Sequence, residues 1–95
     1  MNVNELHTQG KEVSAQSLFK GENGSATAIH LKADAILKTH ITKTPAVLLC
    51  INGLVVYRDE TGKETVLQSG DYVSIEPIVK HWVEAQKHSN LLLLK

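Results

Sequence analysis

Five histidines and one cysteine are the side chains in this sequence that combine metal ligation with an ordinary pKa not far from neutral pH. His40 lies in the segment LKTHITKTPAVLLCING, and His81 lies in the segment GDYVSIEPIVKHWVEA. Imidazole is the commonest protein metal ligand and can also act as a general base. Both residues are therefore candidates for a metal site or for proton transfer, although the sequence contains no evident nucleophile–base pair.

The other candidates have structural interpretations. Cys50 follows Ala46 and Leu48 at strand spacing, so these three side chains are predicted to share an inward face, with Cys50 filling the core. Four strand residues span about 13 Å, which is too far for the Cys50 thiol to reach a metal beside position 46. The remaining histidines are predicted to lie at the surface or in a loose N-terminus: His7, His30 and His88.

The elements that must position His40 and His81 are short strands. Turn signals recur at short intervals, and the segments between them are rich in Val, Ile, Leu and Thr, a pattern typical of an all-β sandwich or barrel. No segment has a sustained helical period. The Asn52-Gly53 pair between two apolar runs predicts a tight hairpin, and RDETGKE at residues 58–64 predicts a longer one around Gly62.

Length and charge limit the classes of function. Ninety-five residues predict one domain over residues 1–95, with residues 1–12 as a candidate loose N-terminus. Ten basic and ten acidic residues give a formal net charge of zero without a basic stripe, so nucleic acid is not an expected partner. The apolar runs are too short to span a membrane. With a single cysteine and no signal peptide, we expect a cytoplasmic protein.

From His40 onward the chain resembles a small single-domain cupin of the RmlC-like, cupin-2-like type. The first cupin motif has two histidines, a glutamate and a glycine, and its spacing is met without a gap at His40, Thr42, Ala46 and Gly53. The second motif runs from a glycine through a proline–glycine turn to a histidine. Its positions correspond to Gly70, Pro77, Ile78 and His81, with the proline one place late and isoleucine in place of glycine.

The resemblance covers roughly residues 26–94 and implies an all-β, cupin-type double-stranded β-helix, a jelly-roll barrel with a pocket at one open end. In cupins with the full motif, three histidines and a glutamate hold a divalent metal. Only two of these ligands remain here, because the Thr42 hydroxyl stays protonated and Ala46 cannot ligate. The predicted ligand pocket consists of His40, Thr42, Ala46 and His81. We expect it to contain no tightly bound metal. Any divalent ion would be held weakly by His40 and His81.

Three functions agree with this pattern. The first is a binding module for a small, neutral or anionic molecule in a metal-free pocket. The second is a cupin enzyme, such as a dioxygenase or isomerase, that uses His40 and His81, for which the sequence assigns no catalytic residue. The third is a structural dimer whose pocket is vestigial. Two close imidazoles would disfavour each other's protonation. His40 and His81 could therefore also be a buried pair without a function in binding or catalysis.

A second copy of the chain is the expected protein partner. Trp82 follows His81 and should therefore point out of the barrel, where a large aromatic side chain needs cover. The N-terminal segment or another subunit could provide that cover. Because a chain this short buries a modest core, we predict a homodimer.

Overall fold

The computed structural model describes residues 1–7 and 10–95. Apart from one 3-10 turn, η1 (Val3–Glu5), the secondary structure of this part consists of strands, so the all-β prediction is confirmed. No helix in it is long and apolar enough to cross a membrane. The strands are β1 (Val13–Lys20), β2 (Ser25–Leu31), β3 (Ile36–His40), β4 (Ala46–Asn52), β5 (Leu54–Asp59), β6 (Glu64–Gln68), β7 (Tyr72–Ile75), β8 (His81–Ala85) and β9 (Ser89–Leu94).

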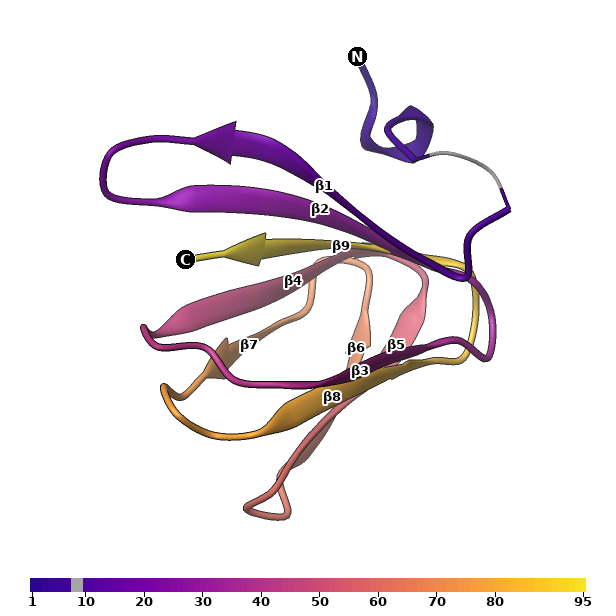
Figure 1. The fold of residues 1–95 in the computed structure, drawn as a ribbon. Coiled ribbons are helices and arrows are strands. Elements are labelled where there is room, and N and C mark those ends of the chain that lie inside the picture. The colour runs from indigo at the N-terminus through magenta and orange to yellow at the C-terminus, as the bar shows by residue number, and fades with distance from the viewer. Residues whose placement is uncertain (8–9) are drawn as a thin grey trace.

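The strands form two antiparallel sheets that face each other (Figure 1). Their order is β1-β2-β9-β4-β7 in the five-stranded sheet and β3-β8-β5-β6 in the four-stranded sheet. Strands that are distant in sequence are neighbours, since β9 lies between β2 and β4 and β8 lies between β3 and β5. This is a jelly-roll arrangement, in which the inner faces of both sheets enclose one core.

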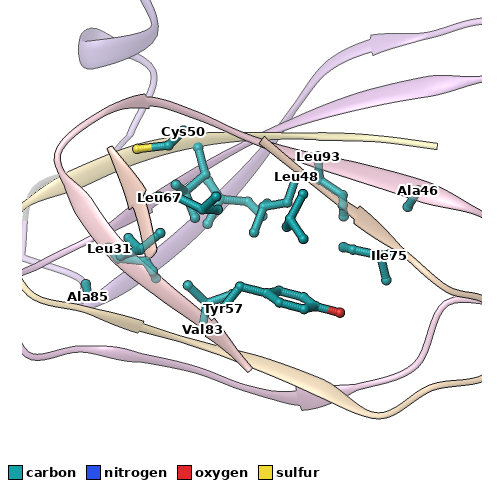
Figure 2. Close-up of a cluster of buried hydrophobic side chains, with 14 of the residues drawn as sticks. Leu31, Ala46, Leu48, Cys50, Tyr57, Leu67, Ile75, Val83, Ala85 and Leu93 are labelled. Carbon is teal, nitrogen blue, oxygen red and sulfur yellow. The ribbon is translucent and has the colours of Figure 1, made fainter. Parts of the chain in front are cut away.

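The core follows from the alternation of side chains along each strand. In β4, Ala46, Leu48 and Cys50 are buried while the residues between them are partly exposed, as predicted. Figure 2 shows these side chains packed with others from both sheets, with Ala46 and Cys50 at opposite ends of the cluster. Burial raises the pKa of the Cys50 thiol, and the charge of Asp71 raises it further. Cys50 is therefore an inert core residue.

The turn at Asn52-Gly53 joins the two sheets, and the predicted hairpin at this position is wrong. β4 pairs with β7 and β9, whereas β5 pairs with β6 and β8. Gly53 has a φ of 104°, and a Cβ atom there would collide with Ser89 Oγ and lie 2.6 Å from the His88 carbonyl oxygen. The residue pair specifies a positive φ, which this crossover requires just as a hairpin would.

The second predicted hairpin is confirmed. β5 pairs with β6 along their whole length, and Gly62 in the connecting loop has a φ of 92°. The Asp59 carboxylate accepts hydrogen bonds from the Thr61 hydroxyl and from the backbone N–H groups of Thr61 and Lys63. The hydrogen bond from the Thr61 hydroxyl is the main reason that the pKa of Asp59 lies below its ordinary value.

The N-terminal segment lies against the outer face of the five-stranded sheet, where η1 is placed above β1 and β2 (Figure 1). Asn4 Oδ1 accepts hydrogen bonds from the side-chain amides of Asn90 and Asn52 at 2.7 and 3.3 Å. His7 Nδ1 lies 2.8 Å from Ser14 Oγ. The segment that the sequence predicts to be loose is thus held by side-chain hydrogen bonds at Asn4 and His7.

Candidate functional site at the barrel mouth

His40 and His81 lie at one end of the barrel, where β3 ends and β8 begins, and are called the mouth pair below. A β-bulge between Leu37 and His40 adds one residue to β3 relative to β8. Because side chains alternate, this extra residue puts His40 on the same inward face as Leu37 and directly opposite His81. The bulge is therefore what brings the two predicted histidines together.

The two rings are in direct contact. His81 is 1% exposed, whereas His40 is half-buried. The ring centroids are 4.3 Å apart, the planes meet at 66°, and the two Nε2 atoms are separated by 3.1 Å. Each Nδ1 lies next to a backbone carbonyl oxygen, at 2.8 Å from Lys38 for His40 and at 3.1 Å from Val79 for His81.

These contacts determine how many protons the mouth pair can hold. A carbonyl oxygen only accepts, so each Nδ1 must carry a proton to complete its hydrogen bond. The Nε2–Nε2 contact needs a third proton, but two neutral imidazoles carry only two. All three hydrogen bonds form together only when the pair holds one positive charge. In the neutral pair with both carbonyl bonds intact, two Nε2 lone pairs face each other.

The surroundings oppose that positive charge. Burial lowers the pKa of the His81 imidazole most strongly, the bond to the Val79 carbonyl raises it, the neighbouring His40 lowers it, and the charge of Asp59 raises it. The net effect is a pKa below the ordinary histidine value. The Tyr57 ring lies stacked on His81 with centroids 5.8 Å apart and closes the inner side. The neutral form of the His81 imidazole is thus favoured.

The space below the mouth pair is small and apolar. Its volume is about 10 Å³, which is enough for one water molecule at most. Besides the two histidines, its walls are aliphatic side chains: Ile29, Leu37, Leu48, Ile75, Val83 and Leu93. The barrel interior is therefore almost filled, and in this conformation it has no room for an organic ligand.

The other two predicted pocket residues do not line this space. Thr42 is 3% exposed, and its Oγ1 is buried without a hydrogen-bond partner among the described residues. Ala46 is buried in the core and otherwise borders an open hollow near Pro45 and Glu76. A role for Thr42 and Ala46 in ligand binding remains a prediction.

The loop between β7 and β8 contains an unfavourable backbone conformation. Ile78 has a φ of 65°, a value that β-branched residues rarely adopt. It occupies the position of the glycine in the second cupin motif, so the loop keeps a glycine conformation without the glycine. The Ile78 side chain is 66% exposed, and its backbone N–H donates to the Thr42 carbonyl at 2.9 Å. This loop carries local strain next to the mouth pair.

The donor set at the mouth does not fit a tightly bound divalent metal. The hydrogen bonds from Nδ1 to backbone carbonyl groups orient the two imidazoles in the way that is usual for histidines that ligate a metal. However, no group of three or more His, Cys, Asp or Glu side chains converges anywhere in residues 1–7 and 10–95. Two converging imidazoles provide fewer donors than zinc sites require, and weak binding is the most they support.

Sequence reasoning missed a second group of histidines, called the outer cluster below: His7, His30 and His88. The ring of His30 lies between the other two, with centroid separations of 5.7 Å to His7 and 6.1 Å to His88. The three residues come from the N-terminal segment, from β2 and from the β8–β9 connection, at the end of the barrel opposite the mouth pair (Figure 1). No motif spacing links them in sequence.

Trp82 points away from the barrel interior, as predicted. It is half-buried and borders a hollow on the outer face of the four-stranded sheet together with Ile36, Lys38 and Thr39. The N-terminal segment lies on the other sheet, so its described residues do not cover this face.

No protein-family model matches the chain, and no curated protein matches it in sequence. Solved structures do resemble it. A cupin superfamily protein from Desulfitobacterium hafniense has a TM-score of 0.86 at 10% identity, over 98% of this chain and 84% of that one. An RmlC-like cupin from Shewanella frigidimarina has a TM-score of 0.80 at 21% identity, over 92% and 78%.

A cupin-2 domain containing protein, also from Shewanella frigidimarina, has a TM-score of 0.79 at 16% identity and is covered over 92% of its length by the whole of this chain. At these identities the likeness concerns the fold. The chain has the fold of a small cupin domain, as the resemblance of its two motifs predicts.

Proposed function

We propose that this protein is a small-molecule-binding cupin whose ligand contacts the mouth pair without a metal. The observation that carries the proposal is the 3.1 Å contact between the two Nε2 atoms, with both Nδ1 atoms engaged by carbonyl groups. The rings are fixed in orientation, and the only polar atoms they leave for a ligand are the two Nε2 atoms.

The chemistry of the mouth pair selects the ligand. In the neutral pair, two Nε2 lone pairs face each other, and a ligand hydroxyl group inserted there would donate a hydrogen bond to one of them. A carboxylate would bind together with one proton taken up from solvent by an Nε2 atom, which then donates to it. The aliphatic floor formed by side chains such as Leu48 and Ile75 suits a short apolar body. The motif positions Thr42 and Ala46 carry no negative charge that would favour a cation. We therefore expect a small hydroxy or carboxylic acid.

Ligand entry requires the mouth to open, because the present void has a volume of about 10 Å³. The strained Ile78 loop is the segment best suited to move. Breaking the hydrogen bond from the Ile78 N–H to the Thr42 carbonyl would release the unfavourable φ in the loop that leads to His81. A strained, exposed loop beside a binding residue is a frequent arrangement at functional sites.

The nearly filled interior also supports a second candidate, a structural protein with a vestigial pocket. In that case the mouth pair is a buried polar contact that fixes β3 against β8, and the loop never opens. The two candidates differ in whether any small acid binds at the mouth.

A ligand screen separates them. Chelator-treated protein would be screened by thermal shift against hydroxy and carboxylic acids, because a ligand that binds the folded state at 100 times its Kd adds about 2.7 kcal/mol of stability. A true ligand raises the Tm of the wild type and not of His81→Gln. His88→Gln, in the outer cluster, is the matched control and should respond like the wild type. No response to any acid would favour the structural candidate.

We further propose that two copies associate through the outer face of the four-stranded sheet, and that the protein acts in the cytoplasm. The support is the half-buried Trp82 beside Ile36, which is 52% exposed, on a face that the N-terminal segment leaves open. Sedimentation should give a dimer, and Trp82→Ala should shift it toward monomer. A wild-type monomer at high micromolar concentration would contradict this interface.

A further inference from the structure

The outer cluster borders a hollow that the barrel pocket does not involve. This outer hollow has a volume of about 360 Å³ and opens between the N-terminal segment, the end of β2 and the β8–β9 connection. Its lining consists of the three cluster histidines and four further residues: Asn4, Gly10, Lys11 and Lys32.

The outer hollow rests on an ordered polar framework. Ser14, His30 and Asn90 are direct neighbours across β1, β2 and β9, and Asn52 of β4 is paired with Asn90. The N-terminal segment is attached to this row through the hydrogen bonds of Asn4 and His7. The imidazoles are therefore presented by hydrogen-bonded strands and not by a free surface loop alone.

The charges around the outer hollow all have one sign. Two lysines and three histidines line it, and no carboxylate of the described residues does. Glu5 and Glu12 are close to lining residues in sequence, but both are exposed and neither borders the hollow. The whole chain contains ten acidic and ten basic residues, so this wall is more basic than the chain as a whole.

This arrangement disfavours its own protonation while it is empty. Burial lowers the pKa of His30, and the charges of His88 and Lys32 lower it further. Burial likewise lowers the pKa of His7, with His30 as the second cause. His7 Nε2 is buried and has no hydrogen-bond partner among the described residues. A bound negative charge would remove the repulsion and give that nitrogen a partner.

A metal ion does not suit the same residues. The His30 and His88 rings are stacked at an interplanar angle of 20°, and the His7 ring is tilted by 34° from His30. Rings that lie on one another do not direct three nitrogen atoms at one point, and the described chain has no converging group of three ligands.

We propose that the outer hollow is a binding site for a dianionic tetrahedral oxyanion, either a free sulfate or phosphate ion or a phosphate monoester. Lys11 and Lys32 supply permanent charge, and His7, His30 and His88 supply donors when they are protonated. Because these groups come from three segments around the hollow, they suit an anion with acceptor oxygens on all sides better than a planar carboxylate.

The test is an NMR titration of the full chain with sulfate, which remains a dianion over the relevant pH range. The histidine ring resonances of the outer cluster should shift and saturate at about pH 6. Binding should be at least about tenfold weaker at about pH 8, where the imidazoles are neutral. Phosphate and a simple alkyl phosphate distinguish the two sources of the anion: tighter binding of the ester assigns an organic phosphate, and equal or weaker binding assigns the free ion.

Two matched variants make the result decisive. Lys32→Gln removes one charge from the outer hollow and should weaken sulfate binding about tenfold. Lys38→Gln removes one charge from the other sheet and should leave the affinity unchanged. Equal effects of the two variants, shifts that never saturate, acetate binding as tight as sulfate, or an affinity that does not fall with rising pH would each overturn the proposal. Circular dichroism of both variants confirms that they are folded.

Discussion

The mouth pair and the outer cluster lie at opposite ends of the barrel and use the same side chain in different surroundings. The mouth pair faces an apolar void and directs both Nδ1 atoms at backbone carbonyl groups. The outer cluster lies outside the sheet beside Lys11 and Lys32. The mouth pair brings two Nε2 atoms into contact with each other, whereas the outer cluster surrounds a hollow together with two lysines.

This difference shows that the partners of an imidazole decide its chemistry. At the mouth, strand register and a bulge position two nitrogens within hydrogen-bonding distance of each other, so the pair suits a neutral or acidic ligand. At the outer hollow, stacking and neighbouring lysines leave the nitrogens apart, and the ligand expected there is an anion. The predictions below separate the two regions, beginning with the largest expected effect.

Gly53→Ala should damage the support of the outer cluster most severely. The new Cβ would collide with Ser89 Oγ and lie 2.6 Å from the His88 carbonyl oxygen, at a φ of 104°. We expect a loss of more than about 3 kcal/mol in the free energy of unfolding, measured by chemical denaturation. Gly62→Ala is the matched control, because its φ is 92° but no atom lies within 4 Å of the new Cβ. Equal losses would mean that only backbone strain matters at Gly53.

Protonation of the mouth pair at acid pH should lower the free energy of unfolding more than protonation of the outer cluster does. The pKa values of His81 and His30 are lowered in the folded state, so below about pH 6.5 the unfolded chain binds more protons. Stability is therefore complete above that pH and is lost as the pH falls through it.

The measurement is the free energy of unfolding as a function of pH. His81→Gln should flatten the acid slope strongly, since His81 is 1% exposed and each pKa unit corresponds to about 1.4 kcal/mol. His30→Gln should flatten it less, because His30 is partly exposed to solvent. The reverse order would contradict the contrast between a buried pair and a solvated cluster.

Ile78→Gly should stabilise the mouth by about 1 kcal/mol. A β-branched residue at a φ of 65° is strained, and glycine removes that strain while only an exposed side chain is lost. Ile41→Gly is the control in the facing loop, where φ is not positive and glycine should destabilise. Denaturation curves in which both variants lose stability would show that the Ile78 loop stores no strain.

Local patterns in the sequence predicted the fold well. The alternation of Ala46, Leu48 and Cys50 identified an inward face, and the spacing from His40 to Gly53 identified the cupin motif. The error at Asn52-Gly53 arose because the residue pair specifies a backbone conformation and not the strand with which the chain pairs next.

The two histidine sites were less predictable from the sequence than the fold was, for physical reasons. Contact between His40 and His81 follows from motif positions, but the bulge that permits it and the small volume below it depend on packing of many side chains. The outer cluster depends on the N-terminal segment being held against β1, and nothing local to His7 indicates that. Residues brought together by tertiary structure alone leave no periodic signal.

Metal analysis of protein purified without an affinity tag tests the central claim most directly. With two imidazoles at the mouth and no third ligand converging with them among the described residues, mass spectrometry should find zinc, iron and manganese far below one ion per chain. Near-stoichiometric metal that disappears in both His40→Ala and His81→Ala would contradict the account and would identify the mouth pair as part of a metal centre.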